Sequence, residues 1–228
     1  MKNIFRASII TLGMLLCLPM GSVYAAENDI EYYENGGTFG YTSKDYSPEI
    51  ENEIDKMMED KMNQDLAGLE NSNNQVQSRQ LIWHSHTDSG THTGMDSRNT
   101  NARSQTTAKG IWGYKNPFVG QLDTAGSSKG EYAGPSTPSK IVLNQSYVIN
   151  GTQLSVSVSL PPSASYSADK STGSWQSQPL TNRKIVTASY PTMRATTTVG
   201  ITSVTFTDTA DIYFGGTIYR PTSRVTLK

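Results

Sequence analysis

Residues 146–160, with the sequence SYVINGTQLSVSVSL, carry the clearest fold signal in this chain of 228 residues. The Asn150-Gly151 dipeptide suits the two positive-φ positions of a type I′ turn, which predicts a β-hairpin centred on it. After this turn, apolar residues at alternate positions are separated by serines. Such alternation predicts a strand with one face in the core, so Val156 and Val158 are expected to be buried.

The rest of the region at 109–228 continues this β pattern. Runs rich in β-branched residues are separated by turn residues, and no helical periodicity follows Leu69. Asp208 and Asp211 are predicted to lie in a hairpin loop. The fold class is therefore predicted to be mainly β, with an antiparallel β-sandwich or barrel-like domain at 109–228. Further strands are predicted at 185–190, 195–201, 203–207, 212–214 and 218–219.

The N-terminal residues have the features of a secretory signal peptide. Lys2 and Arg6 precede an uncharged, mostly apolar run, and Ala25 is a small residue at a position that suits signal-peptidase cleavage. The apolar run is much shorter than the roughly 20 residues of a membrane-spanning helix, which disfavours stable membrane insertion. Cleavage after residues 1–25 would remove Cys17, the only cysteine, and would exclude disulfides from the mature chain. We expect a secreted protein that is extracellular or associated with the cell envelope.

Charge divides the mature chain into two parts. Residues 27–70 hold thirteen acidic side chains against three lysines, whereas residues 71–228 hold seven acidic and fourteen basic side chains. We therefore predict that the acidic N-terminal segment, residues 26–79, interacts with the chain's own β domain. This segment is either a docked arm, a solvated tail or a removable pro-segment. Arg79 offers a basic site to a processing protease.

The acidic segment is predicted to contain one amphipathic helix at 48–69. Ser47 is a good N-cap, Pro48 suits the first helical position, and glutamates follow in the first turn. Apolar residues then recur at three- and four-residue spacing up to Leu69, before an Asn-rich stretch. Because such a helix cannot bury its apolar stripe alone, either the β domain or a separate partner must cover it.

A polar stretch at 80–108 is predicted to be a linker or loop, and it contains all three histidines of the chain. His84 and His86 form an H-x-H pair, whose imidazoles point to the same side of an extended segment. Together with Asp88 and His92 they are candidate ligands of a zinc ion, because imidazole and carboxylate groups bind zinc in proteins. The alternative is a polar loop whose exposed histidines bind no metal.

The composition predicts a neutral, polar surface, since 17% of the residues are charged, against roughly 25% in an average domain. Trp112, Tyr166 and Trp175 are candidates to stack on a sugar ring, although aromatic residues of a β domain are also common in its core. Basic residues are spread along 71–228 without a dense run, which disfavours nucleic acid as a partner. A polysaccharide, an anionic envelope polymer or another surface protein fits this composition better.

Motifs for catalysis are weak throughout the chain. Residues 126–130, GSSKG, match the nucleophile-elbow pattern G-x-S-x-G, but no helix is predicted after them, so a polar turn is expected. The sequence contains no phosphate-binding or dinucleotide-binding motif. The leading hypothesis is therefore a secreted, non-catalytic binding module without a cofactor. The alternative is a secreted metal-dependent hydrolase that uses His84, His86 and His92.

Overall fold

The structure is a computed structural model that describes residues 29–35, 38–76, 85–116, 119–152, 154–158, 167–169 and 171–228. The predicted signal peptide and the predicted site residues Arg79, His84 and Tyr166 lie outside these ranges. Across the described ranges, no helix is at once long enough and apolar enough to cross a membrane.

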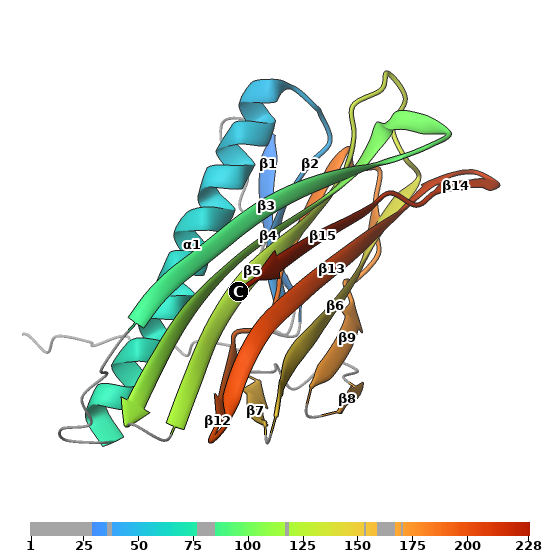
Figure 1. Cartoon of the computed structure of the whole chain (residues 1–228). Coiled ribbons are helices and arrows are strands. Elements are labelled where there is room, and N and C mark those ends of the chain that lie inside the picture. Colours follow the sequence, from blue (N-terminus) through green and yellow to red (C-terminus); the bar gives the residue numbers. More distant parts are fainter. Residues whose placement is uncertain are drawn as a thin grey trace, which may run out of the picture.

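Eight of the described strands form one antiparallel sheet, here called sheet A (Figure 1). They are β1 (Ile30–Asn35), β2 (Thr38–Ser43), β3 (Ser85–Asp96), β4 (Asn99–Asn116), β5 (Val119–Tyr132), β7 (Ser155–Val158), β11 (Ile185–Ser189) and β12 (Met193–Thr197). β5 is central, because it pairs with β4 along one edge and with β11 and β12 along the other. β3 pairs with β4 and lies at one end of the sheet.

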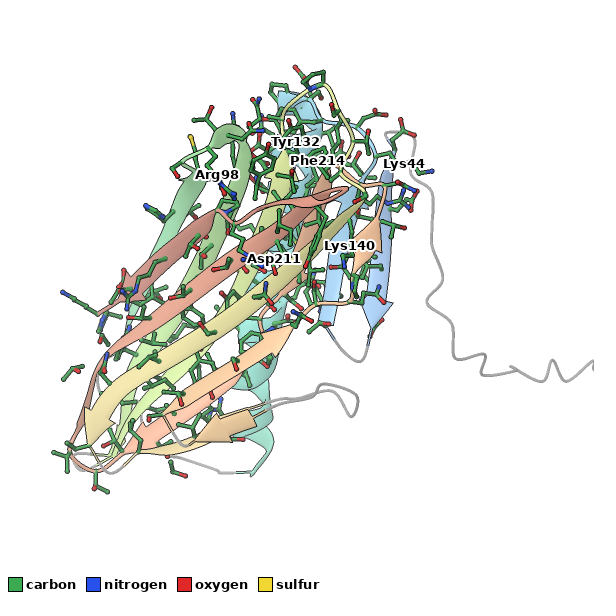
Figure 2. The ribbon with its side chains drawn as sticks, turned by 90° about the vertical axis from the view of Figure 1, so that its right-hand side faces the viewer. Lys44, Arg98, Tyr132, Lys140, Asp211 and Phe214 are labelled. Atoms are coloured by element: carbon green, nitrogen blue, oxygen red, sulfur yellow. The ribbon has the colours of Figure 1, made fainter. Side chains whose placement is uncertain are left out.

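Seven described strands form the second antiparallel sheet, sheet B, which faces the viewer in Figure 2. They are β6 (Lys140–Thr152), β8 (Ser167–Asp169), β9 (Thr172–Gln176), β10 (Leu180–Thr181), β13 (Gly200–Phe214), β14 (Thr217–Tyr219) and β15 (Thr222–Leu227). β13 pairs with β6 on one edge and with β14 and β15 on the other. The predicted mainly β, antiparallel fold is confirmed, and the two sheets are not closed into a barrel.

The two sheets pack face to face, and both contribute to the core between them. In one apolar cluster, Trp112 and Leu122 of sheet A are joined by Phe206 of sheet B. A second cluster contains Ala210, four residues further along β13 than Phe206. Between these two positions lies Asp208, whose carboxylate accepts a hydrogen bond from a serine of β4 at 2.8 Å. The core is therefore two apolar regions separated by a polar layer.

Two turns predicted from local sequence are strand interiors in the structure. Asn150 and Gly151 lie within β6, where Asn150 pairs with Ser203 of β13, so the predicted hairpin is wrong. Asp208 lies in the middle of β13 and is buried, so the predicted loop between Asp208 and Asp211 is also wrong. The continuous pairing of β6 with β13 satisfies the backbone of both segments, and it outweighs the local preference for a turn.

The predicted linker is also largely strand. Residues 85–108 form β3 and most of β4, and residues 126–130, predicted as a turn, lie inside β5. β4 has strands on both edges, and the side chains that it turns into the core are small ones such as Ala102, Ser104 and Thr106. Because these residues lack an apolar alternation, the sequence pattern did not reveal the strand. β1 and β2, from the acidic segment, extend sheet A through β11.

Candidate binding cleft between helix α1 and sheet A

Helix α1 (Pro48–Val76) lies along the outer face of sheet A (Figure 1). It begins where the sequence predicts, because the Ser47 Oγ accepts the backbone N–H of Ile50 at 3.2 Å and caps the first turn. It continues beyond Leu69, the predicted end, to Val76. The long helix therefore contacts β2, β5 and β11 of sheet A.

The apolar stripe of α1 is covered by the sheet. Ile54 and Met58 pack in one cluster with Ile185 of β11. Met62 and Leu66 are buried in another cluster with an alanine of β5. Burial of a full Ile, Leu or Met side chain contributes roughly 1.5–3 kcal/mol, so this stripe is a substantial part of what keeps α1 on the sheet.

A cleft of about 400 Å³ lies between α1 and strands β3 and β4. Its helix side carries two carboxylates and two thioethers, and its floor carries small polar side chains from the strands. A volume of roughly 300–1,000 Å³ is typical of small-molecule sites. The lining residues are Asp55, Met58, Glu59, Met62, Ser89, Gly90, Thr91, Gln105, Thr107, Ala108, Lys109 and Ser127.

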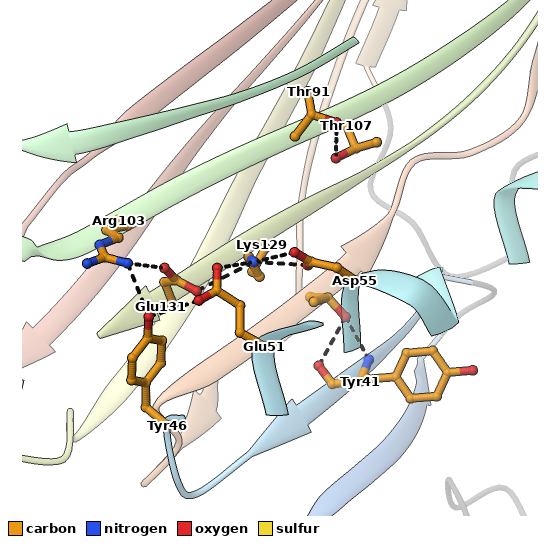
Figure 3. Close-up of polar contacts among 10 residues, drawn as sticks. Tyr41, Tyr46, Glu51, Asp55, Thr91, Arg103, Thr107, Lys129 and Glu131 are labelled. Atoms are coloured by element: carbon orange, nitrogen blue, oxygen red, sulfur yellow. Dashed lines mark hydrogen bonds and ion pairs between the residues drawn. The ribbon is translucent and has the colours of Figure 1, made fainter. Parts of the chain in front are cut away.

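The floor of the cleft is formed by alternate residues of β3 and β4, which point to the same face of the sheet. Thr91 pairs with Thr107, and their hydroxyl oxygens lie 3.1 Å apart (Figure 3). At one end of the cleft, Lys109 Nζ donates to the Asn63 Oδ1 of α1 at 2.8 Å. The floor therefore offers mainly uncharged hydroxyl and amide groups.

A cluster of charged residues lies at the other end of the cleft, near the start of α1 (Figure 3). The buried Lys129 Nζ lies 2.9 Å from both the Glu51 Oε1 and the Asp55 Oδ1 of the helix. It also lies 3.6 Å from the Glu131 Oε2 on its own strand. Arg103 Nη1 of β4 is 3.3 Å from the Glu131 Oε1. These five residues, called the charged cluster below, join α1 to two strands of sheet A.

Burial and opposite charges set the ionisation of the charged cluster. Burial raises the pKa of the Glu131 and Asp55 carboxyl groups above their ordinary values. Burial has the opposite effect on Lys129, but the carboxylates of Glu131 and Asp55 outweigh it and raise the pKa of the ammonium. For Glu51, burial is outweighed by hydrogen bonds from Lys129 and Tyr46, so its pKa is lowered. Lys129 therefore stays cationic at neutral pH.

The cleft lining presents hydroxyl, amide and carboxylate groups that can form hydrogen bonds. Glu131 and Lys129, the most buried members of the charged cluster, do not belong to the cleft lining. Asp55 and Glu59 do line it, and a carboxylate accepts hydrogen bonds strongly. Hydroxyl, amide and carboxylate groups together match a ligand with many hydroxyl groups.

No protein-family model and no curated protein matches this chain. Its function therefore has to be inferred from the geometry of its own residues.

The predicted zinc ligands in the described residues lie on one strand, β3, where they contact β15. The Asp88 Oδ2 accepts the backbone N–H of Lys228 at 2.8 Å, and the His92 Nδ1 accepts that of Arg224 at 3.5 Å. The His86 ring stacks parallel to an indole of β4, with 5.8 Å between ring centroids. These side chains supply hydrogen-bond partners to the free edge of sheet B.

The same contact pattern continues at the far end of β3, where the Asp96 Oδ2 accepts the backbone N–H of Arg220 at 2.7 Å. His86 and His92 are six residues apart on a strand, hence roughly 20 Å apart, and cannot bind the same ion. Among the described residues, no three His, Cys, Asp or Glu side chains lie close enough to hold a metal. A zinc site that includes His84 stays a prediction.

The structure brings neither of the two described tryptophan candidates to the cleft. Trp112 and Trp175 are 8% and 7% exposed, and both belong to the core between the sheets. Trp175 also donates its indole N–H to Gln145 and meets Tyr190 edge-on, with 4.9 Å between ring centroids. Their ring faces are occupied by the protein itself.

The sequence analysis missed the residues that form the cleft floor. They lie on β3 and β4, in the stretch predicted as a linker, and hydroxyl residues do not show a hydrophobic period. A period-two signal was nevertheless present, because Thr, Ser, Thr and Thr occupy positions 87, 89, 91 and 93. Alternating β-branched hydroxyl residues favour a strand even without apolar partners.

Proposed function

We propose that this chain is a secreted, non-catalytic binding module whose cleft between α1 and sheet A binds a neutral saccharide. The observation that carries the proposal is the lining, with hydroxyl and amide groups on the floor and the carboxylates of Asp55 and Glu59 on the helix side. Sugar hydroxyls donate to carboxylates and exchange hydrogen bonds with protein hydroxyls.

Charge favours a neutral ligand over the anionic envelope polymer considered from the composition. The two carboxylates of the cleft lining outnumber its one lysine, Lys109, so the lining has a net negative charge and would repel a polyanion. Several basic residues of the β region are already paired inside the protein, Lys129 with α1 and Arg194 with Asp123 at 2.6 Å. Arg183 is likewise paired with Glu31. These ion pairs neutralise part of the excess of basic residues in the β region.

Binding to an array of neutral and acidic glycans, followed by calorimetry with the neutral glycans that bind, tests this function. Thr107→Val removes a floor hydroxyl and Glu59→Gln removes a wall charge. Each should weaken binding roughly 3- to 10-fold, because one hydrogen bond contributes about 0.5–1.5 kcal/mol.

Matched controls separate these effects from general damage to the protein. Thr209→Val alters a similar hydroxyl pair on sheet B, where the Thr209 and Thr222 oxygens are 2.9 Å apart. Asp60→Asn removes a charge beside Glu59 but outside the cleft lining. The proposal is wrong if no neutral glycan binds, or if the cleft variants bind as well as these controls.

The secreted hydrolase remains the alternative, and the zinc content of tag-free protein distinguishes it. Stoichiometric zinc that is lost in a His84→Ala/His86→Ala double variant would favour a metal-dependent activity.

A further inference from the structure

β3 contributes Ser89 and Thr91 to the cleft floor, and exposed hydroxyl side chains continue along that strand. Ser89 and Thr91 line the cleft and are exposed to solvent. Thr87 and Thr93 are exposed as well, and they point to the same face because side chains alternate along a strand. β3 pairs with β4 without a register shift over this stretch, so the row of four hydroxyl groups is continuous.

The β4 residues that pair with these four hydroxyl residues form a second row beside the first. Thr87 pairs with Ile111 and Thr93 with Gln105, and two further pairs on the same face lie between them. Ile111 is half-buried under the end of α1, whereas Gln105 belongs to the cleft lining. A strand advances about 3.3 Å per residue, so the row from 87 to 93 is roughly 20 Å long. The four hydroxyl residues are uncharged, Asp88 between them points to the opposite face, and Lys109, which pairs with Ser89, is the one charged residue of the second row.

We propose that the ligand is a linear, neutral polysaccharide that binds along β3 through several consecutive sugar units, rather than a single terminal sugar. This inference rests on the proposed function of the cleft. A repeating row of hydroxyl groups presents the same hydrogen-bonding groups at regular intervals, which matches a polymer with a repeating unit. An uncharged row gains nothing from a polyanion or a polycation, so a neutral chain is its best partner.

The dependence of affinity on chain length tests the proposal. The probes are linear glucose and N-acetylglucosamine oligomers, from monomer to hexamer, measured by calorimetry with the full chain. Affinity should rise roughly 3- to 10-fold with each added unit that gains a hydrogen bond, until the row is filled. Equal affinity for the monomer and the hexamer would overturn the extended mode while leaving the cleft as a saccharide site.

Two variants at the ends of the row make the test specific. Thr87→Val and Thr93→Val keep the β-branched shape that suits an exposed strand position. Each should weaken binding of the hexamer several-fold and leave binding of the shortest oligomer that binds unchanged, whereas Thr107→Val should weaken both. Unchanged hexamer affinity in both end variants refutes the extended mode. If no oligomer of any length binds, the proposed function itself is wrong.

Discussion

Replacement of Lys129 by methionine would show how much the charged cluster contributes to stability. The ammonium is 4% exposed and lies 2.9 Å from both Glu51 and Asp55, next to the fully buried Glu131. Methionine has a similar length but no charge. In the variant, Arg103 would be the one cation left in the charged cluster, beside three carboxylates. Removing one partner of a buried ion pair costs about 3–5 kcal/mol. We expect the free energy of unfolding to fall by about 3 kcal/mol, the lower end of this range, because Glu51 and Asp55 are partly exposed to water.

The assay is urea unfolding followed by circular dichroism at pH 7 and pH 5. Burial already raises the pKa of Glu131 and Asp55, and loss of the cation raises it further. A carboxyl group whose pKa is raised by folding makes the folded state more stable as the pH falls toward the pKa of the unfolded chain. The loss of stability in Lys129→Met should therefore be smaller at pH 5 than at pH 7. The double variant Lys129→Met/Glu131→Gln should recover part of the loss at pH 7.

Lys56→Met is the matched control, because Lys56 is an exposed lysine of α1 next to Asp55, and its effect should stay within about 0.5 kcal/mol. A loss below about 1 kcal/mol for Lys129→Met at pH 7, as for a surface ion pair, would refute the reasoning. An equal loss at both pH values would refute it as well.

Four further substitutions probe the body of the fold, each followed by urea unfolding. Asp208→Asn should stabilise the protein at pH 8 and lose this advantage toward pH 4. Burial raises the pKa of Asp208 well above its ordinary value, so ionisation of this carboxyl group opposes folding. A stabilisation that does not depend on pH would contradict this prediction. Asp96→Asn should have the opposite profile, a loss of about 1–2 kcal/mol at pH 7 that disappears in acid, since hydrogen bonds from arginine hold the pKa of Asp96 well below its ordinary value. Gly94→Ala should cost about 1–3 kcal/mol, because its Cβ would lie 1.8 Å from the Thr222 carbonyl oxygen and would push β3 from β15. Gly68 lies on α1 with open space around it, so Gly68→Ala should be neutral or stabilising by up to about 1 kcal/mol. Equal effects at the two glycines would argue against close packing between β3 and β15 at Gly94.

The candidate site shows why sequence reasoning reached only part of the function. Asp88 and His92 were visible as polar residues with metal-ligand chemistry, but their partners are the backbone N–H groups of Lys228 and Arg224, more than 130 positions away. Thr91 and Thr107 become neighbours through strand pairing, and α1 completes the cleft from a third segment of the chain. A spacing pattern cannot reveal such a site, because each of its sides comes from a different part of the sequence.

Some features follow from the sequence by itself because their physics is local. The start of α1 depends on Ser47 and Pro48 next to their own helix, and its apolar stripe depends on spacing within a few turns. The mainly β character follows from β-branched residues and their alternation. By contrast, the strand identity of residues 85–108, the extended path through Asn150-Gly151 and the burial of Asp208 were decided by the tertiary structure. In each case distant strands supply the backbone hydrogen bonds and cover the side chains, and these non-local interactions outweigh the local turn preferences that the sequence displays.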